Sequence, residues 1–281
     1  MEPLTRENYA TNHDYMSYSR FRRFLRCEAS AVSDYREPPT TALLFGSYVD
    51  AYFSNELEQF VLEHPEVYKK DGTLKADFVT CQDIITRIES DEQFSHLLSG
   101  EKQKIMTGEI DGMPFKIKID SYLPDEAIVD LKVMKDFNRV WSDALGRNTN
   151  FIEAYDYDIE MAIFQEVAYQ NTGKRLPVYI AAITKESPSD IGIFKLSQTI
   201  LDNAMQIVKG YLPRIKQVID GEVAPTRCEK CAYCRSTKKA RIIDINEEDD
   251  FDLIGASGDR LREEGYVCED PKVTIKNKEG K

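Results

Sequence analysis

Three strand-like runs in the middle of the chain most constrain its fold. Residues 104–110 and 113–122 flank an Asp-Gly dipeptide that favours a tight hairpin turn. A third run, residues 127–133, follows a second turn that contains Pro124. Consecutive runs joined by such short turns predict an antiparallel meander of three strands. We therefore expect the meander to form the centre of the fold.

The meander carries charged residues at positions that can converge. Asp130 and Lys132 are two residues apart on the third run, so their side chains point to the same face of the sheet. Antiparallel pairing with the second run can bring Asp120 beside them. Hard divalent cations prefer oxygen ligands, and a lysine stabilises negative charge on a phosphate. The set therefore suits Mg²⁺ or Mn²⁺ and a phosphodiester, although a hairpin with ordinary surface charges is the alternative.

Helices and two further strands are expected around the meander. Apolar residues at helical spacing predict helices over 17–35, 41–62, 78–98, 157–170 and 198–221, and a short one over 136–145 with the only tryptophan, Trp141. Buried strands are predicted over 178–185 and 191–196. The expected fold class is α/β (α+β), with a central mixed sheet flanked by helices. One domain is expected over 1–242, followed by an acidic, partly mobile tail over 243–281.

The distribution of charge matters more than the formal net charge of −12. Acidic residues gather in the tail after Ile243. Two basic clusters permit a locally positive DNA groove, although solvated helix faces explain them equally well. Their members are Arg20, Arg22, Arg23 and Arg26, and then Arg235, Lys238, Lys239 and Arg241. The polar N-terminus and the lack of a long apolar run predict a cytoplasmic protein without a membrane span.

The predicted helix over 157–170 contains two groups of polar residues. Asp156, Asp158 and Glu160 lie at its start, where interaction with the helix dipole explains them, so we do not assign them to a metal site. Gln165 and Tyr169 are four residues apart and share a face. Outside this helix, Glu109 on the first strand-like run can either approach the carboxylates from a neighbouring strand or face solvent.

The order of these motifs resembles the PD-(D/E)XK nuclease superfamily, whose signature is an aspartate followed by Asp/Glu-x-Lys. Gly46 followed by Asp50 resembles the first motif of the RecB-like branch, in which many relatives carry histidine at the second position. Gln165 and Tyr169 resemble the Gln-x-x-x-Tyr motif of that branch. The resemblance covers most of the chain, from Met16 to Lys239, and is nearest to phage exodeoxyribonuclease VIII-like (RecE-type) exonucleases.

The resemblance implies a restriction-endonuclease-like core and a metal-dependent deoxyribonuclease. Such an exonuclease would degrade linear duplex ends in phage-type or bacterial recombination or repair, leave 5′-phosphates, and supply a single strand to an annealing protein. A homo-oligomer is compatible with this function. The implied site residues are the metal ligands Asp50, Asp120 and Asp130, with Lys132, Gln165 and Tyr169 as catalytic or positioning groups. A nuclease-like fold that binds DNA or protein without cleavage is an alternative, as is a CRISPR-adaptation nuclease.

Six cysteines in a chain expected to be cytoplasmic do not indicate disulfides. Cys228, Cys231 and Cys234 are spaced C-x₂-C-x₂-C, and Cys27 lies far upstream. Some RecB-like nucleases hold an iron–sulfur cluster with one cysteine before the nuclease core and three after it, and this arrangement resembles theirs. Four thiolates suit a [4Fe–4S] cluster or tetrahedral Zn²⁺. Three reduced thiols on a turn, with an unrelated buried Cys27, are the remaining interpretation.

Overall fold

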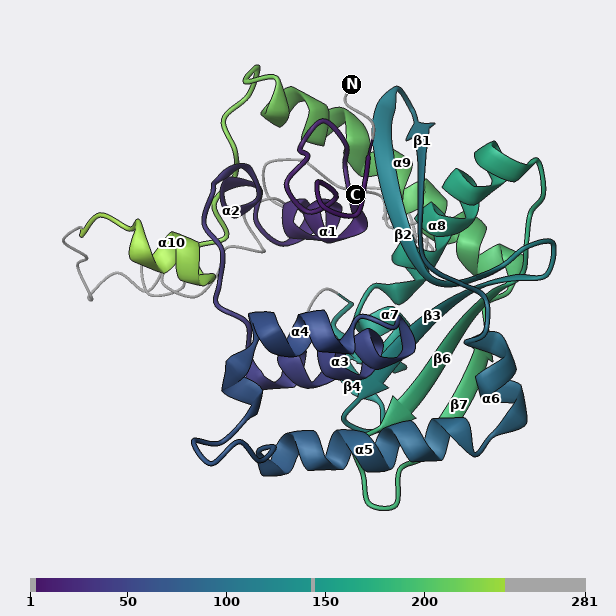
Figure 1. Ribbon diagram of the computed structural model, residues 1–281. Helices are drawn as coiled ribbons and strands as arrows, with labels where there is room; N and C mark the ends of the chain where they lie inside the picture. The colour runs from purple at the N-terminus through teal and green to yellow at the C-terminus, as the bar shows by residue number, and fades with distance from the viewer. Residues whose placement is uncertain (1–3, 143–144, 241–281) are drawn as a thin grey trace.

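Figure 1 shows the computed structural model, which describes residues 4–142 and 145–240. The expected acidic tail over 243–281 lies outside these residues. A five-stranded mixed sheet forms the centre, with the spatial order β1-β2-β3-β6-β7. Its strands are β1 (Glu101–Ile110), β2 (Met113–Leu123), β3 (Ala127–Met134), β6 (Val178–Thr184) and β7 (Ile191–Lys195). The predicted α/β class with a central mixed sheet is confirmed.

The first three strands form the predicted antiparallel meander. Asp111 and Gly112 both have positive φ angles, 46° and 78°, which is the backbone conformation that a tight two-residue hairpin turn requires. The chain then crosses over so that β6 pairs with β3 in parallel, and β7 returns antiparallel to β6. In Figure 1 the β1–β2 hairpin rises away from the other three strands.

Helices cover both faces of the sheet (Figure 1). One apolar core lies between the sheet and the helices α1, α8 and α9, and the other lies between the sheet and α3, α5 and α6. The first group, with the neighbouring α2, spans Tyr18–Arg26 (α1), Glu28–Val32 (α2), Tyr157–Thr172 (α8) and Gln198–Ile219 (α9). The second, with α4, spans Thr41–Phe53 (α3), Leu57–Glu63 (α4), Ala76–Glu89 (α5) and Glu92–Leu97 (α6). Short elements complete the chain: the 3₁₀ turn η1 (Pro65–Val67), α7 (Phe151–Ala154) and α10 (Ala232–Ser236).

Strand β3 divides its residues between the two cores. Val129 and Leu131 belong to the core beneath α3 and α5, whereas Ile128 belongs to the core beneath α8 and α9. Because side chains alternate along a strand, Asp130 and Lys132 point to the same side as Ile128. Two charged residues therefore interrupt the apolar face of a central strand, where only a functional or compensated arrangement is tolerated.

Three of the predicted helices are each broken into two. The helix expected over 17–35 is interrupted at Cys27, whose backbone is extended. The helix over 41–62 is interrupted near Asn55, which has a φ of 59°. In the third, Asp91 accepts a hydrogen bond from the Phe94 amide and so caps a new helix, α6. Apolar residues keep their helical spacing across each break, so the sequence pattern does not reveal where one helix ends and the next begins.

The predicted helix over 136–145 is wrong. The chain instead forms β4 (Val140–Ser142), which pairs antiparallel with β5 (Arg147–Thr149) in a separate two-stranded sheet. Val140 and Trp141 are residue types that favour strands, and the window is too short to build a helical apolar face. Trp141 is exposed on this small sheet. Within the described part of the chain, no helix has the length and apolar character that a membrane crossing needs.

Two glycine substitutions test the packing beside the first strand of the sheet and inside α3. A Cβ atom at Gly100 would lie 2.4 Å from the Tyr122 carbonyl oxygen, so Gly100→Ala should lower the free energy of unfolding by roughly 1–3 kcal/mol. A Cβ atom at Gly46, inside α3, would meet nothing within 4 Å. Gly46→Ala should therefore raise the free energy of unfolding by about 0.5–1 kcal/mol. Urea denaturation of both variants measures these changes, and a stable Gly100→Ala protein would contradict the packing described.

Candidate active site

The site lies where β2 and β3 separate. Their pairing runs from Leu123 opposite Ala127 to Ser121 opposite Val129 and then ends. If the same register continued for one more residue, Asp120 would lie opposite Asp130. The Asp120 carboxylate instead accepts a hydrogen bond from the Leu131 amide at 2.9 Å, so a side chain satisfies a backbone donor that the ladder leaves unpaired. Asp120 is thereby held next to the chain at Asp130, and its charge acts on that carboxylate.

Asp130 and Lys132 form a buried ion pair beside this separation. The distance from Asp130 Oδ2 to Lys132 Nζ is 2.7 Å, and the Asp130 side chain is only 4% exposed. Burial, together with the charges of Glu160 and Asp120, raises the pKa of Asp130 well above its ordinary value. The neighbouring carboxylates also raise the pKa of Lys132, overcoming the burial that opposes its charge. Lys132 is therefore held in its protonated form.

Glu160 completes the surroundings of Lys132, although the sequence pattern led us to attribute it to the helix dipole and to leave it out of the site. It lies in the first turn of α8, and its Oε2 is 3.0 Å from Lys132 Nζ. The Tyr157 ring lies beneath the same ammonium, with 4.7 Å between Nζ and the ring centroid. Asp156 does not join them, because it pairs with Arg22 at 3.0 Å. The i, i+3 spacing of Tyr157 and Glu160 on one helix face was the available signal.

Asp50 and Gln103 extend the site toward α3. Gln103 Nε2 donates to Ser54 Oγ at 2.9 Å, to Asp120 Oδ1 at 3.3 Å and to Asp50 Oδ1 at 3.4 Å. Gln103 is buried in β1 and has a φ of 52°, so its backbone departs from regular strand geometry at the position opposite Asp120. Burial, and next the charge of Asp120, raise the pKa of Asp50 to about 7.

The donor atoms of the site fit a hard divalent cation. Asp50, Asp120 and Asp130 offer carboxylate oxygens, which are the ligands that Mg²⁺ and Mn²⁺ prefer. Three buried oxygens nearby, Gln103 Oε1, Asp130 Oδ2 and Glu160 Oε2, make no hydrogen bond, although the last two lie at ion-pair distance from Lys132. Several carboxylates around one ammonium leave an excess of negative charge, which a bound cation would neutralise.

Gln165 and Tyr169 lie further along α8, away from the carboxylates. Gln165 is buried, and its amide bonds to the Leu176 carbonyl at 3.0 Å and to the Gln198 side chain. The Tyr169 ring packs against the Arg175 guanidinium at 4.5 Å. With a rise of about 1.5 Å per residue, Gln165 lies about 7.5 Å and Tyr169 about 13.5 Å beyond Glu160 along the helix. The structure does not join either residue to the carboxylate site.

The segment before α1 packs against β2 and reaches the neighbourhood of Glu160. Arg6 pairs with Glu56 at 2.8 Å and donates to the Lys102 carbonyl, which attaches the segment to the residue before α4 and to β1. Lys116 on β2 donates to the carbonyls of Tyr9 and Asn12. The pKa of Tyr9 is raised by burial and by the charge of Glu160, so this tyrosine lies near Glu160. No sequence pattern identified this contact.

The basic residues singled out in the sequence mostly make contacts within the chain. In the first cluster, Arg20 donates to the His13 carbonyl, Arg22 pairs with Asp156, and Arg23 donates to the Ser30 and Tyr35 carbonyls. In the second, Arg235 donates to the Lys230 carbonyl and Lys238 lies 3.9 Å from Glu229; Arg241 is outside the described residues. Lys102 and Lys118, like Lys132, interact electrostatically with Asp50. Glu109 is exposed near the turn end of β1, where its backbone bonds to the Gln170 side chain.

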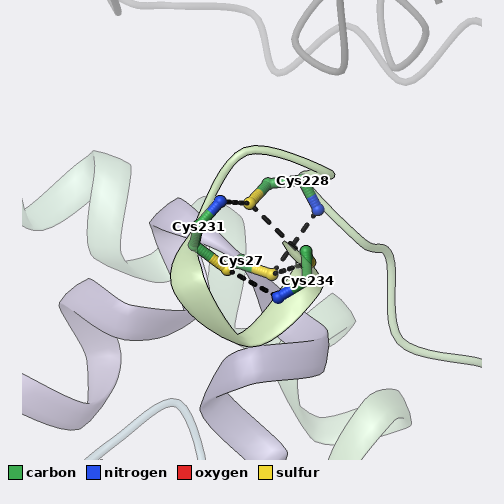
Figure 2. Close-up of side chains that lie close together, drawn as sticks. All are labelled: Cys27, Cys228, Cys231 and Cys234. Carbon is green, nitrogen blue, oxygen red and sulfur yellow. Dashed lines mark hydrogen bonds between the residues drawn. The ribbon is translucent and has the colours of Figure 1, made fainter. Parts of the chain in front are cut away.

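The four candidate cysteines gather at a second location. Cys27 lies between α1 and α2. Cys228 and Cys231 precede α10 and Cys234 lies within it, beside α2 at the outer edge of the molecule (Figure 1). Figure 2 shows their side chains pointing toward one another. Their sulfur atoms all lie within 4.8 Å of one another, so one ion can contact all four.

Comparison with known proteins adds to this geometry. A family model described as a PDDEXK-like domain of unknown function (DUF3799) matches residues 17–237. A provisionally assigned exonuclease from Eubacterium rectale, solved at 2.19 Å, is 40% identical with a TM-score of 0.85, and the match covers 91% of this chain and 99% of that chain. A second solved structure, SSO0001, is 11% identical with a TM-score of 0.29, and the match covers 80% of this chain and 96% of that chain. No curated protein matches the sequence.

Because the pKa of Asp50 is raised, we expect the free energy of unfolding to depend on pH in buffer without added divalent ions. A neutral Asp50 stabilises the folded state below its unfolded pKa of 3.8, and this contribution is lost as the pH rises through about 7. Asp50→Asn cannot acquire the charge. From about pH 4 to about pH 8 the variant should therefore gain stability relative to the wild type, by up to a few kcal/mol because one pKa unit is worth about 1.4 kcal/mol.

Urea denaturation across this pH range measures the difference. Burial and the charge of Asp120 raise the pKa of Asp50, whereas the charges of Lys118 and Lys132 oppose this rise. The side chains of Asp120, Lys118 and Lys132 are unchanged in the variant. Asp83→Asn, at an exposed position on α5, is the matched control and should show no such trend. Parallel stability curves for wild type and Asp50→Asn would contradict the burial of Asp50 beside Asp120.

Proposed function

The chain belongs to the family of PDDEXK-like domains (DUF3799), and on this premise we propose that it is a metal-dependent deoxyribonuclease that degrades linear duplex DNA from its ends. The observation that carries the proposal is the position of Asp120 on the Leu131 amide, between Asp130 and Lys132 in the chain, with Lys132 paired to Asp130. The similarity to a provisionally assigned exonuclease over nearly the whole of both chains supports exonuclease activity in particular.

We assign the metal to the carboxylates at the strand separation. Asp120 and Asp130 would hold Mg²⁺ or Mn²⁺, and Asp50 would contribute from α3 through its position next to Asp120. When bound, the cation supplies Lewis-acid stabilisation of the charge that develops on a phosphodiester under attack. Gln103, which donates to both Asp50 and Asp120, fixes the orientation of these two carboxylates before any cation binds.

Lys132 is assigned the role of a fixed positive charge. Because its pKa is raised by the carboxylates around it, Lys132 keeps its proton near neutral pH and cannot serve as a general base. Asp130 and Glu160 hold its ammonium from two sides at 2.7 Å and 3.0 Å. A preorganised cation of this kind stabilises negative charge on a phosphate without reorganising during the reaction. Glu160 is thus a positioning residue for Lys132.

The biological setting follows from the substrate that we assign. Hydrolysis that leaves 5′-phosphates on shortened duplex ends would expose single strands, which a strand-annealing protein could use in recombination or repair. Lys102 and Lys118, which both interact electrostatically with Asp50, would contact the DNA backbone next to the scissile phosphate. Phosphate contacts of this kind position DNA without reading its sequence, as an exonuclease requires.

Replacing one metal ligand should separate catalysis from folding. Asp130→Asn removes a carboxylate charge at nearly constant size, so we expect DNA cleavage to fall by roughly 10²-fold or more while the circular dichroism spectrum is retained. Asp125→Asn is the matched control, because Asp125 lies exposed in the turn between β2 and β3, where it pairs with Lys174. Wild-type cleavage by folded Asp130→Asn protein would refute the assignment of this residue.

The proposed substrate is tested with end-labelled linear duplex and covalently closed circular duplex, in Mg²⁺, in Mn²⁺ and in EDTA. We expect the linear DNA to be degraded from its labelled end only when a divalent ion is present, and the closed circle to persist. Cleavage of the circle would indicate an endonuclease instead. Binding that persists in EDTA, without degradation in either metal, would favour a DNA-binding module.

A further inference from the structure

We propose that Cys27, Cys228, Cys231 and Cys234 bind a single Zn²⁺ ion in a tetrahedral site, in place of the iron–sulfur cluster that the RecB-like resemblance implies. The four side chains come from two distant parts of the chain and converge on one point (Figure 2). Cys27 and Cys234 are buried, and the other two are partly exposed at the molecular edge. The proposal concerns a site separate from the carboxylates and does not depend on the proposed nuclease activity.

The spacing of the sulfur atoms matches one tetrahedral ion. Zn²⁺ binds thiolates at about 2.3 Å, so a regular tetrahedron places its four sulfurs about 3.8 Å from one another. In the structure, Cys27 Sγ is 3.5 Å from Cys234 Sγ, and Cys228 Sγ is 3.9 Å from Cys234 Sγ. No pair among the four exceeds 4.8 Å. The observed separations therefore bracket the value that a four-thiolate zinc site requires.

The same spacing does not fit a [4Fe–4S] cluster. In such a cluster each cysteine binds a different iron atom, and the irons and inorganic sulfides occupy the space between the thiolates. The thiolate sulfurs must therefore stand farther apart than those around a single shared ion. Sulfur atoms in near van der Waals contact, such as those of Cys27 and Cys234, leave no room for the body of a cluster.

Backbone amides around the cysteines are arranged to stabilise thiolates. The Cys231 amide donates to Cys228 Sγ at 3.3 Å, and the Cys234 amide donates to Cys231 Sγ at 3.4 Å. The Cys228 amide donates to Cys27 Sγ at 3.5 Å. Glu229 has a φ of 56°, a left-handed conformation within the first of the two C-x₂-C turns. Amides that point at sulfur lower the cost of collecting negative charge, and a doubly charged cation would compensate the remainder.

Two properties select zinc over other ions. An all-thiolate tetrahedral site excludes the oxygen-seeking cations Mg²⁺ and Ca²⁺. Among the divalent metals that accept sulfur, Zn²⁺ binds more tightly than Fe²⁺ in the usual order of affinities, and it has no preferred geometry that the tetrahedron would oppose. The four protein ligands also leave no open position, which is the property of a structural zinc site and not of a catalytic one.

The surrounding contacts hold the site together without the ion. The Glu28 carboxylate accepts two hydrogen bonds from the Arg214 guanidinium, each 3.0 Å, and a third from the Thr226 amide at 2.7 Å. The Ala29 amide donates to the Thr226 carbonyl. These bonds join α2 to the chain that leads into α10. The cysteine site is therefore preorganised, and a variant that loses zinc keeps an independent attachment between the same segments.

The position of Cys27 also connects the ion to the carboxylate site. Cys27 directly follows α1, and α1 contacts the start of α8 through Tyr18, whose hydroxyl donates to the Asp156 carbonyl at 2.9 Å, and through the pair of Arg22 with Asp156. The same end of α8 carries Glu160, which holds Lys132. An ion that fixes the end of α1 thus supports, through two packed helices, the geometry around Lys132.

Elemental analysis of the full-length protein tests the proposal. The protein is purified anaerobically, without chelator or added metal, from cells supplied with both iron and zinc. We expect one zinc per chain, no acid-labile sulfide, and no brown colour. Replacement of the ion by Co²⁺ should give the intense visible absorption of a tetrahedral cobalt–thiolate complex, a readout that needs no variant and does not depend on nuclease activity.

Cysteine variants assign the ligands. Cys228→Ser should lose the zinc and have a lower Tm, whereas Cys81→Ser should retain one zinc per chain, because Cys81 is buried between α3 and α5, far in the fold from α10. If Cys228→Ser fails to fold, Cys231→Ser at the other partly exposed ligand provides the same test. Iron with inorganic sulfide in the anaerobic protein would overturn the proposal. So would a single iron, four reduced thiols without metal, or full zinc retention in a folded Cys228→Ser protein.

Discussion

The site depends on one hydrogen bond from a side chain that replaces a backbone hydrogen bond between two strands of the sheet. Where β2 stops pairing with β3, the Leu131 amide would be left without an acceptor in a buried strand, and the Asp120 carboxylate supplies one. This substitution lets the β1–β2 hairpin turn away from β3 without the cost of an orphaned donor. It also fixes Asp120 at the strand separation, where its charge acts on Asp130. The separation of the strands and the position of the carboxylate are therefore a single structural feature.

The charges at this separation are unfavourable for folding alone. Asp50, Asp120, Asp130 and Glu160 surround Lys132, and the pKa of Asp50 and that of Asp130 are raised by burial and by their neighbours. A fold selected only for stability would place apolar residues on the face of β3 that carries Asp130 and Lys132, as it does at Ile128. The excess negative charge becomes favourable when a cation binds, so we interpret the repulsion between these carboxylates as the cost of a preorganised metal site.

Local patterns were sufficient for much of the fold and for part of the site. The Asp-Gly turn and the alternation along 113–122 and 127–133 predicted the meander, and period two placed Asp130 and Lys132 on one face. Gln103 and Glu160 were not assigned to the site because their roles arise from contacts distant in sequence. Gln103 acts from an irregular position in β1, and an acidic residue in the first turn of a helix, such as Glu160, looks the same whether it serves the helix dipole or a lysine. Strand β4, which pairs with β5, lies where we expected a helix. A sequence window this short holds too few apolar residues for their spacing to distinguish a helix from a strand.

Anomalous diffraction from crystals grown with Mn²⁺ tests most directly whether the strand separation is a metal site. Data collected above and below the manganese absorption edge locate the ion independently of any activity assay. We expect an anomalous peak between β2 and β3, bonded to oxygens of Asp120 and Asp130, with Asp50 on the α3 side. An occupied manganese elsewhere on the protein, with no peak between these two carboxylates, would contradict it.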